Sequence, residues 1–299
     1  MRIREMVWVL ALAQVVVAGP VVAQSLDDLR NDHRSSGDVL TYGMGYNNQR
    51  YSPLTSINKG NIAKLVPVWN YSLNNAQGQE SQPVIYQGVM YGSTHTATVA
   101  VDALTGRQLW KQTLEFPPDV FKMACCGLVN RGVAVYNGKV FRTTLDAQVI
   151  ALDAKTGKEI WKSKAIDYQL GHAMTGAPLI ANGVLMTGIA GGEYGTRGFI
   201  DGWDPETGKQ LWRTYTAAAG DEKGADTWPG DTAQKGGAPT WLTGSYDPEL
   251  DLVYWGTGNG GPWNAEARKG DNLYICSVVA FRPKTGEIVW HYQFSPNDP

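Results

Sequence analysis

One short pattern, Asp-x-x-Thr-Gly-x-x-x-Trp, occurs three times at even spacing and constrains the fold more than any other feature of the sequence. Its copies begin at Asp102, Asp153 and Asp204. An Asp side chain caps a tight turn, Gly takes the positive-φ position of that turn, and a strand carrying the Trp follows. Equivalent units at a fixed spacing predict a repeat architecture.

Two further segments resemble the pattern. Residues 282–290 keep its Thr, Gly and Trp but have lost the Asp, and residues 64–72 around Trp69 look like the tail of an earlier copy. Alternating apolar runs separated by Gly or Asn-Gly turns lie between the copies and give about four short strands per repeat. We therefore expect an all-β fold, a β-propeller with about four to five blades in this chain, whose repeat tryptophans pack between blades.

Composition supports this fold and excludes one class of partner. The chain has Gly 35, Trp 11 and Tyr 14, which favours short strands and glycine turns over helices. A net charge of -2, with Lys and Arg scattered along the chain, leaves no basic surface. Nucleic acid is therefore not expected as a partner.

The N-terminus has the layout of a secretory signal peptide. Arg2 and Arg4 precede an apolar run over residues 6–18, and this run is shorter than the roughly 20 residues of a membrane anchor. The sequence predicts a signal peptide over residues 1–23, a mature domain over residues 24–299 and a periplasmic location. Such an oxidising compartment permits disulfides.

Cys125 and Cys126 are adjacent, which is unusual for either structural or reactive cysteines. Neighbouring Cα atoms lie about 3.8 Å apart, below the usual disulfide range. A bridge between them closes no loop and removes almost no chain entropy. The residues alone leave two readings: a pair of buried thiols without a role, or a bridge that belongs to a functional site.

Residues 124–132, Ala-Cys-Cys-Gly-Leu-Val-Asn-Arg-Gly, resemble the vicinal-cysteine segment of PQQ-dependent (quinoprotein) alcohol dehydrogenases of the methanol and ethanol type. The tryptophan repeat is similar to the blade motif of that family, and the resemblance runs from about Asp38 to the end of the chain. It implies an eight-bladed propeller that oxidises a primary alcohol to the aldehyde by hydride transfer to metal-bound pyrroloquinoline quinone (PQQ).

The resemblance also implies the cofactor contacts. A disulfide between Cys125 and Cys126 would lie against one face of the quinone, and Trp241 would stack on the other. Arg131 is the catalytic candidate, because its fixed charge would stabilise the reduced quinone. Further contacts with the cofactor are implied for Glu80, Thr175, Gly191 and Gly192.

Two segments resemble the metal loops of the family. Glu193 lies in Gly-Gly-Glu-Tyr-Gly-Thr-Arg-Gly, and Asn259 lies in Gly-Thr-Gly-Asn-Gly-Gly-Pro-Trp-Asn. Carboxylate and amide oxygens are hard ligands that suit Ca²⁺ or a lanthanide better than zinc or copper. The two residues are therefore the predicted metal ligands.

The sequence departs from the family pattern at two places. Ala190 stands where the family commonly has a serine, which removes one hydrogen bond to the cofactor. The catalytic aspartate of the family follows Pro-His-Asp-x-Trp-Asp, whereas this chain reads Pro296-Asn297-Asp298-Pro299. We expect an N-terminal part of the propeller that lacks this general base and, alone, aggregates or stays inactive.

The resemblance implies a small alcohol as substrate, a cytochrome c as electron acceptor and peripheral association with a membrane. The sequence has no Cys-x-x-Cys-His motif for a c-type haem. Two alternatives stay open: a non-catalytic propeller scaffold of the cell envelope, which explains the repeat but not the combined site residues, and a quinoprotein acting on sugars or polyols.

Overall fold

The computed structural model describes residues 24–299, so the predicted signal peptide lies outside the described residues. This part of the chain has a short helix α1 (Leu26–Asn31) and four sheets of four antiparallel strands each. The strands are β1 (Val84–Tyr86), β2 (Val89–Ser93), β3 (Ala97–Asp102), β4 (Gln108–Thr113), β5 (Ala134–Tyr136), β6 (Lys139–Thr143), β7 (Gln148–Asp153), β8 (Glu159–Lys164), β9 (Leu179–Ala181), β10 (Val184–Gly188), β11 (Phe199–Trp203), β12 (Gln210–Tyr215), β13 (Ser245–Asp247), β14 (Leu252–Gly256), β15 (Ser277–Phe281) and β16 (Ile288–Gln293).

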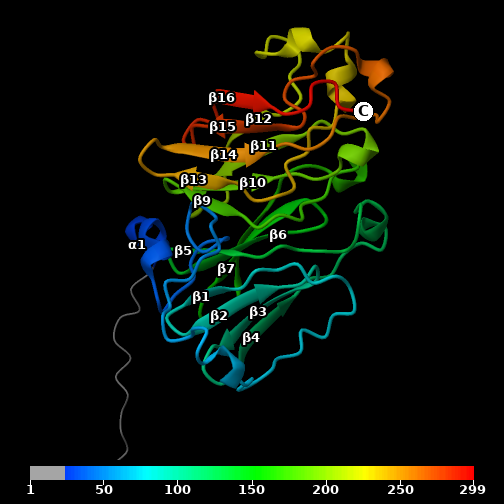
Figure 1. The fold of residues 1–299 in the computed structure, drawn as a ribbon. Coiled ribbons are helices and arrows are strands. Elements are labelled where there is room, and N and C mark those ends of the chain that lie inside the picture. The colour runs from blue at the N-terminus through cyan, green and yellow to red at the C-terminus, as the bar shows by residue number, and fades with distance from the viewer. Residues whose placement is uncertain (1–23) are drawn as a thin grey trace, which may run out of the picture.

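Within every sheet the strands are hydrogen-bonded in chain order, so each sheet is one antiparallel meander. Figure 1 shows the four sheets following one another in space in the order of the sequence, from β1–β4 to β13–β16. Each sheet corresponds to one predicted repeat. The all-β propeller expectation is confirmed, and four sheets fall within the expected four to five blades.

Burial explains why the third strand of each blade is nearly all apolar. Strands β3, β7 and β11 are buried on both faces because neighbouring blades cover them, whereas the fourth strands β4, β8 and β12 consist mostly of exposed and half-buried residues. A strand covered on both faces needs a continuous apolar run. The fourth strands therefore form the outer rim.

Two-residue turns join the first and second strands in the first three blades. Asn137 and Gly138 have φ values of 47° and 73°, and Asn182 and Gly183 have 46° and 74°. Positive φ at both central positions is the signature of a type I′ turn, whose twist matches that of the flanking strands. The Asn-Gly pairs in the sequence thus become blade hairpins.

The tryptophan of each repeat packs on the glycine of the next repeat. Trp110 Nε1 donates to Ala154 O at 3.0 Å, and a Cβ added to Gly157 would lie 2.5 Å from Trp110 Cε3. The indole therefore needs a residue without a side chain beneath it. The same contact joins Trp69 to Gly106, Trp161 to Gly208 and Trp212 to Gly286.

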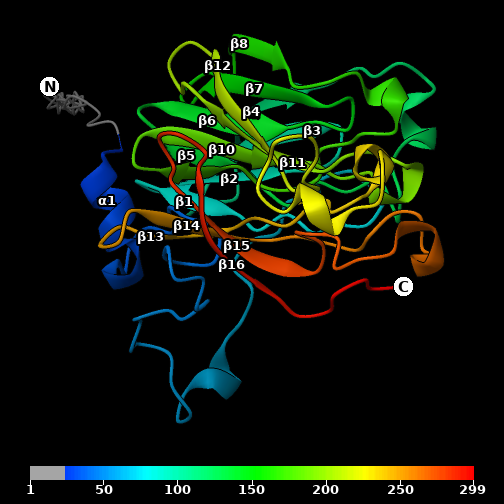
Figure 2. The same cartoon turned by 90° about the horizontal axis from the view of Figure 1, so that it is seen from above.

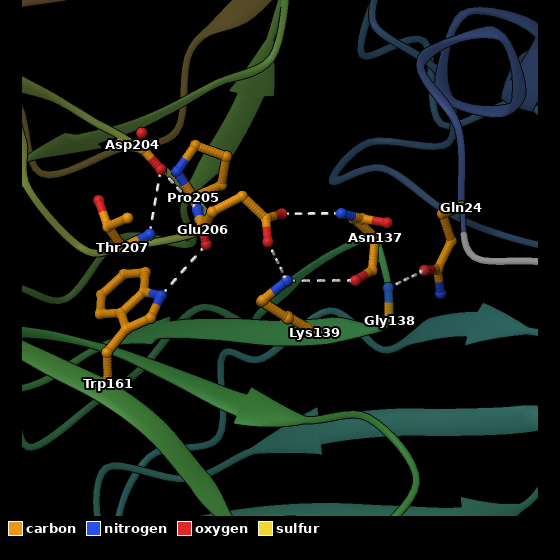
Figure 3. A network of polar contacts seen from close by, with 9 residues as sticks. All are labelled: Gln24, Asn137, Gly138, Lys139, Trp161, Asp204, Pro205, Glu206 and Thr207. Carbon is orange, nitrogen blue, oxygen red and sulfur yellow. Dashed lines mark hydrogen bonds and ion pairs between the residues drawn. The ribbon is translucent and has the colours of Figure 1, made fainter.

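Polar contacts reinforce the junction between the second and third blades, as Figure 3 shows. Trp161 Nε1 donates to Pro205 O at 3.1 Å. On the same turn, Glu206 accepts from Asn137 Nδ2 at 2.7 Å and pairs with Lys139 Nζ at 2.7 Å. The docking turn of one blade thus binds both the outer strand and the inner hairpin of its neighbour.

The segment before β1 contacts several blades. Gln24 Oε1 accepts from Gly138 N at 3.1 Å, Val39 pairs with β1, and Tyr46 O accepts from Tyr246 N at 3.2 Å. This segment therefore ties the first, second and fourth blades together. Residues 50–66, by contrast, project away from the sheets in light blue in Figure 2.

The interval between Gly208 and Gly286 is longer than the earlier repeat intervals because it contains two irregular connections, residues 216–244 and 257–276. They contain the 3₁₀ helices Ala225–Thr227, Thr232–Lys235 and Ala265–Arg268. Among residues 24–299 no helix is long and apolar enough to cross a membrane. Loops of this length on a rigid scaffold commonly carry function.

His172 is a titratable group that the fold buries. It is 5% exposed, and its ring centroid lies 5.9 Å from that of Phe199. Burial lowers the pKa of His172 to about 4, because the charged form loses its hydration. The folded protein therefore holds this imidazole neutral near pH 7.

The tryptophan contact makes Gly157→Ala destabilising. The substitution puts Cβ into the Trp110 ring and also strains a backbone with φ of +69°. We expect a loss of about 3 kcal/mol in the free energy of unfolding, about half of it from overpacking. Gly138→Ala is the matched control, because φ is +73° there and nothing lies within 4 Å of its Cβ. Equal losses in chemical denaturation of the two variants would contradict the docking role.

The buried imidazole makes stability depend on pH. The pKa of His172 is lower in the folded chain than the usual 6.5, so the unfolded chain binds more protons between those values and stability falls as pH drops through them. We expect His172 to contribute a loss of up to about 3 kcal/mol from pH 7 to pH 4. Denaturation of His172→Gln at both pH values should show a smaller loss, whereas exposed His33→Gln should match the unsubstituted protein.

Candidate functional site

A cavity of about 240 Å³ brings together all the predicted site residues except Glu80 and Gly192. They come from the connections between blades and from the loops β10–β11 and β14–β15. The lining residues are Met123, Cys125, Cys126, Val129, Arg131, Ala173, Thr175, Ala190, Gly191, Glu193, Trp241 and Asn259. Segments far apart in the sequence thus converge because the blades place their loops side by side.

A larger cavity of about 570 Å³ lies between the first and second blades. Its lining includes Tyr91, Lys139 and Asp153 and none of the predicted site residues. It is a groove between neighbouring blades near the docking turn. Size alone therefore does not mark the site, and the convergence of predicted residues favours the smaller cavity.

Cys125 and Cys126 form a disulfide, so they are a bridged pair and not two free thiols. Cys126 has φ of +68° and Gly127 has φ of +118°, so the chain turns sharply at the bridge. Because both cysteines line the cavity, the bridge forms a compact, apolar part of its wall.

Arg131 is fixed from three sides. Its Nη2 pairs with Glu80 Oε2 at 2.7 Å, its Cζ lies 4.7 Å from the ring centroid of Trp241, and its backbone N–H donates to Thr175 O at 3.0 Å. Its Nη1 is buried and has no hydrogen-bond partner among the described residues. A buried donor without a partner is costly, so an acceptor oxygen from a ligand would be stabilised there.

Glu80 does not line the cavity. Its carboxylate pairs with the Arg131 guanidinium, and its side chain is 45% exposed. The sequence analysis predicted that Glu80 and Arg131 each contact the cofactor, whereas in the structure they form an ion pair with each other. Glu80 can thus orient the guanidinium, a role that the sequence reasoning missed.

Gly191 and Gly192 of the predicted metal loop have no room for a side chain, because other parts of the protein lie too close to them. A Cβ on Gly191, where φ is +121°, would lie 2.1 Å from Gly171 O, and a Cβ on Gly192 would lie 2.9 Å from Pro239 Cδ. Gly192 packs against protein and does not line the cavity. Each of the two glycines thus packs closely against another segment of the protein. Ala190, the residue before them, lines the cavity.

Glu193 and Asn259 supply oxygen donors to the same cavity. Glu193 lies on the 3₁₀ helix Gly192–Tyr194. Asn259 Nδ2 donates to Gly260 O at 3.0 Å, which leaves Oδ1 as its acceptor, and Asn259 O accepts from Ala238 N at 2.9 Å. In residues 24–299 no cluster of three or more His, Cys, Asp or Glu could hold a metal. The donor set of one carboxylate and one amide fits a hard cation that takes further oxygen ligands from elsewhere.

Asn130 is a supporting residue that the sequence reasoning did not single out. Its Oδ1 accepts from Gly132 N at 3.1 Å, and its Nδ2 donates to Thr143 O at 3.1 Å. The side chain is buried between two residues that line the cavity, Val129 and Arg131. Its place inside the vicinal-cysteine motif was the signal that could have identified it.

Comparison with known proteins supports this fold and identifies the family. The family model described as "Glucose/ethanol/alcohol dehydrogenase, beta-propeller domain" matches residues 40–298. Quinoprotein alcohol dehydrogenase PedH of Pseudomonas putida is 41% identical over 97% of this chain and 52% of its own length. The dehydrogenase subunit of alcohol dehydrogenase (quinone) of Gluconobacter oxydans is 45% identical over 88% of this chain and 38% of its own length.

A solved structure gives the same result. The europium-containing methanol dehydrogenase superposes with a TM-score of 0.86 at 38% identity, over 91% of this chain and 51% of that one. The chain thus spans about half the length, or less, of the relatives it matches. The resemblance found in the sequence is confirmed, and the chain belongs to the PQQ-dependent alcohol dehydrogenase family, as a β-propeller homologous to the quinoprotein ethanol and methanol dehydrogenases.

Proposed function

We propose that this chain provides the PQQ-binding and metal-binding side of an enzyme that oxidises a primary alcohol to the aldehyde. One observation carries the proposal: the Cys125–Cys126 disulfide, Trp241 and an Arg131 with an unpartnered buried donor all border one cavity. A non-catalytic scaffold has no need for this combination.

The residues present fit the cofactor. Arg131 Nη1 needs an acceptor, and an orthoquinone has adjacent carbonyl oxygens. Trp241 and the disulfide offer the flat and compact apolar surfaces that would hold a planar ring system between them, with Thr175 at the edge. When bound, PQQ would supply the hydride acceptor and the metal a Lewis acid.

We further propose that Glu193 and Asn259 hold Ca²⁺ or a lanthanide. Their oxygens have the hardness that both kinds of ion prefer. One structural relative is a europium-containing methanol dehydrogenase, which supports including lanthanides. A titration with each ion decides the preference between them.

The chain's own side chains would have distinct tasks. Arg131 would orient the cofactor and stabilise negative charge on it, while Glu80 holds the guanidinium in place. Trp241 and the disulfide would exclude water from the reacting region. We propose that the proton acceptor is an aspartate from the part of the propeller that the longer relatives have and the matched region does not include.

We propose that the protein works in the periplasm, after export directed by residues 1–23. An oxidising compartment is consistent with the Cys125–Cys126 disulfide. The names of relatives, which include a quinohemoprotein and a dehydrogenase subunit, support an electron-transfer partner. We therefore propose a cytochrome c as acceptor and peripheral membrane association.

Glu193→Ala tests the metal assignment. We expect calcium or lanthanide affinity to fall on the order of 100-fold, because a carboxylate ligand is lost. The measurement is an absorbance titration of the full-length gene product with PQQ and CaCl₂ or LaCl₃, followed by ethanol or glucose with an artificial electron acceptor. Exposed Glu159→Ala is the control and should bind and reduce the dye like the unsubstituted protein.

The same titration separates the alternatives. Uptake of PQQ with ethanol-dependent dye reduction supports the alcohol dehydrogenase. Uptake of PQQ with dye reduction that depends on glucose and not on ethanol would indicate a sugar or polyol enzyme. A folded protein that takes up no PQQ would contradict the proposal and leave the scaffold propeller.

Arg131→Lys tests the cofactor assignment. Lysine keeps the charge and can pair with Glu80, but it loses the planar fork of donors. We expect PQQ affinity to fall at least about tenfold, which corresponds to one charge-assisted hydrogen bond. Fluorescence titration with PQQ measures this loss, and an unchanged affinity would remove Arg131 from the cofactor site.

A further inference from the structure

Arg268 is a fully buried cation at the end of the 3₁₀ helix Ala265–Arg268. Its Nε donates to Pro262 O at 2.9 Å, its Nη1 donates to Asn272 Oδ1 at 2.8 Å, and its Nη2 donates to Asp298 O. The guanidinium therefore binds three acceptors from three different places in the chain.

One face of this guanidinium supports the loop of the predicted ligand Asn259. A Cβ on Gly260, the residue after Asn259, would lie 2.4 Å from Arg268 Cζ. The guanidinium thus packs directly on the Gly260 backbone and also binds the carbonyl of Pro262, two residues further on. Both contacts lie within three residues of Asn259.

Arg268 also contacts Asn297 and Asp298, within residues 296–299. Besides the bond to Asp298 O, Asn297 Nδ2 lies within hydrogen-bond distance of Arg268 O at 2.9 Å, Gly270 O at 2.8 Å and Asn272 Oδ1 at 3.1 Å. This is the segment that stands where the family has the sequence leading to its catalytic aspartate. Arg268 therefore connects the predicted metal loop to it.

The chemistry of Arg268 makes this connection specific. All three acceptors of its side chain are neutral oxygens. The Asp298 carboxylate offsets the cost of burial only in part, so the pKa of Arg268 is lowered by desolvation. The planar fork satisfies three acceptors in fixed directions, which an ammonium cannot do. A buried guanidinium held in this way fixes the relative positions of the groups it binds.

We propose that Arg268 is a positioning residue that holds the Asn259 loop and residues 296–299 in one arrangement, so that metal affinity and alcohol turnover both depend on it. The inference rests on the proposed function of Asn259 as a metal ligand. It assigns Arg268 no contact with substrate, cofactor or metal.

Arg268→Lys tests this role. We expect the Kd for calcium, measured by calorimetric titration of the PQQ-loaded protein with CaCl₂, to rise about 10- to 100-fold, the usual effect of losing a residue that orients a ligand. In the full-length gene product at saturating CaCl₂, kcat for ethanol should stay below that of the unsubstituted protein, because residues 296–299 remain displaced.

Arg142→Lys is the matched control for burial. Arg142 is also fully buried and binds neutral oxygens of Thr94, His95 and Thr98, but it does not contact the Asn259 loop. Arg142→Lys should lower Tm and leave the calcium Kd within about twofold of the value for the unsubstituted protein, because substitutions at sites that share no partner have independent effects. Equal calcium affinities in the two Lys variants would overturn the positioning role.

Gly260→Ala provides a second route if Arg268→Lys does not fold. The added methyl would press on the guanidinium, whereas Gly256→Ala, with nothing within 4 Å, is its control. We expect only Gly260→Ala to raise the calcium Kd, and equal values would count against the inference. If the unsubstituted protein takes up neither PQQ nor calcium, the proposed function fails and the positioning role fails with it.

Discussion

The packing of an indole on a glycine of the next blade is the contact on which the rest of this structure depends. Each such tryptophan donates one hydrogen bond to a turn carbonyl and covers a glycine that has no room for a side chain. The contact recurs at successive junctions, so it sets the distance and angle between neighbouring sheets. Only with those fixed do loops from different blades meet around one cavity.

The fold could be predicted because its determinants are local and repeated. The Asp-capped turns, the Asn-Gly hairpins and the tryptophan strands each occupy a few consecutive residues, and their spacing shows up as a period. Even Trp69, in the tail of an incomplete copy, packs on Gly106 as the tryptophans of the complete copies pack on their glycines. Composition and periodicity were therefore sufficient for the class of fold and for its blades.

The site could be predicted only through the family resemblance, because its residues come from loops with no period. Nothing in the spacing of Glu193 and Asn259 indicates that both border one cavity. The pairing of Glu80 with Arg131 and the support of Gly260 by Arg268 stayed unpredicted for the same reason. Such contacts depend on where irregular segments lie in the folded protein, and no local sequence pattern indicates those positions.

Because the candidate site is built from loops of consecutive blades, the blades can shift only slightly relative to one another without disturbing it. Between the Cys125–Cys126 wall and Asn259 lie three docking junctions in series, made by Trp110, Trp161 and Trp212. Displacements at junctions in series add, and catalytic arrangements tolerate errors of only about 0.5 Å. The positional error allowed at each junction is therefore smaller than the error allowed at the site as a whole. An aromatic ring packed directly on a glycine backbone leaves little room for such an error.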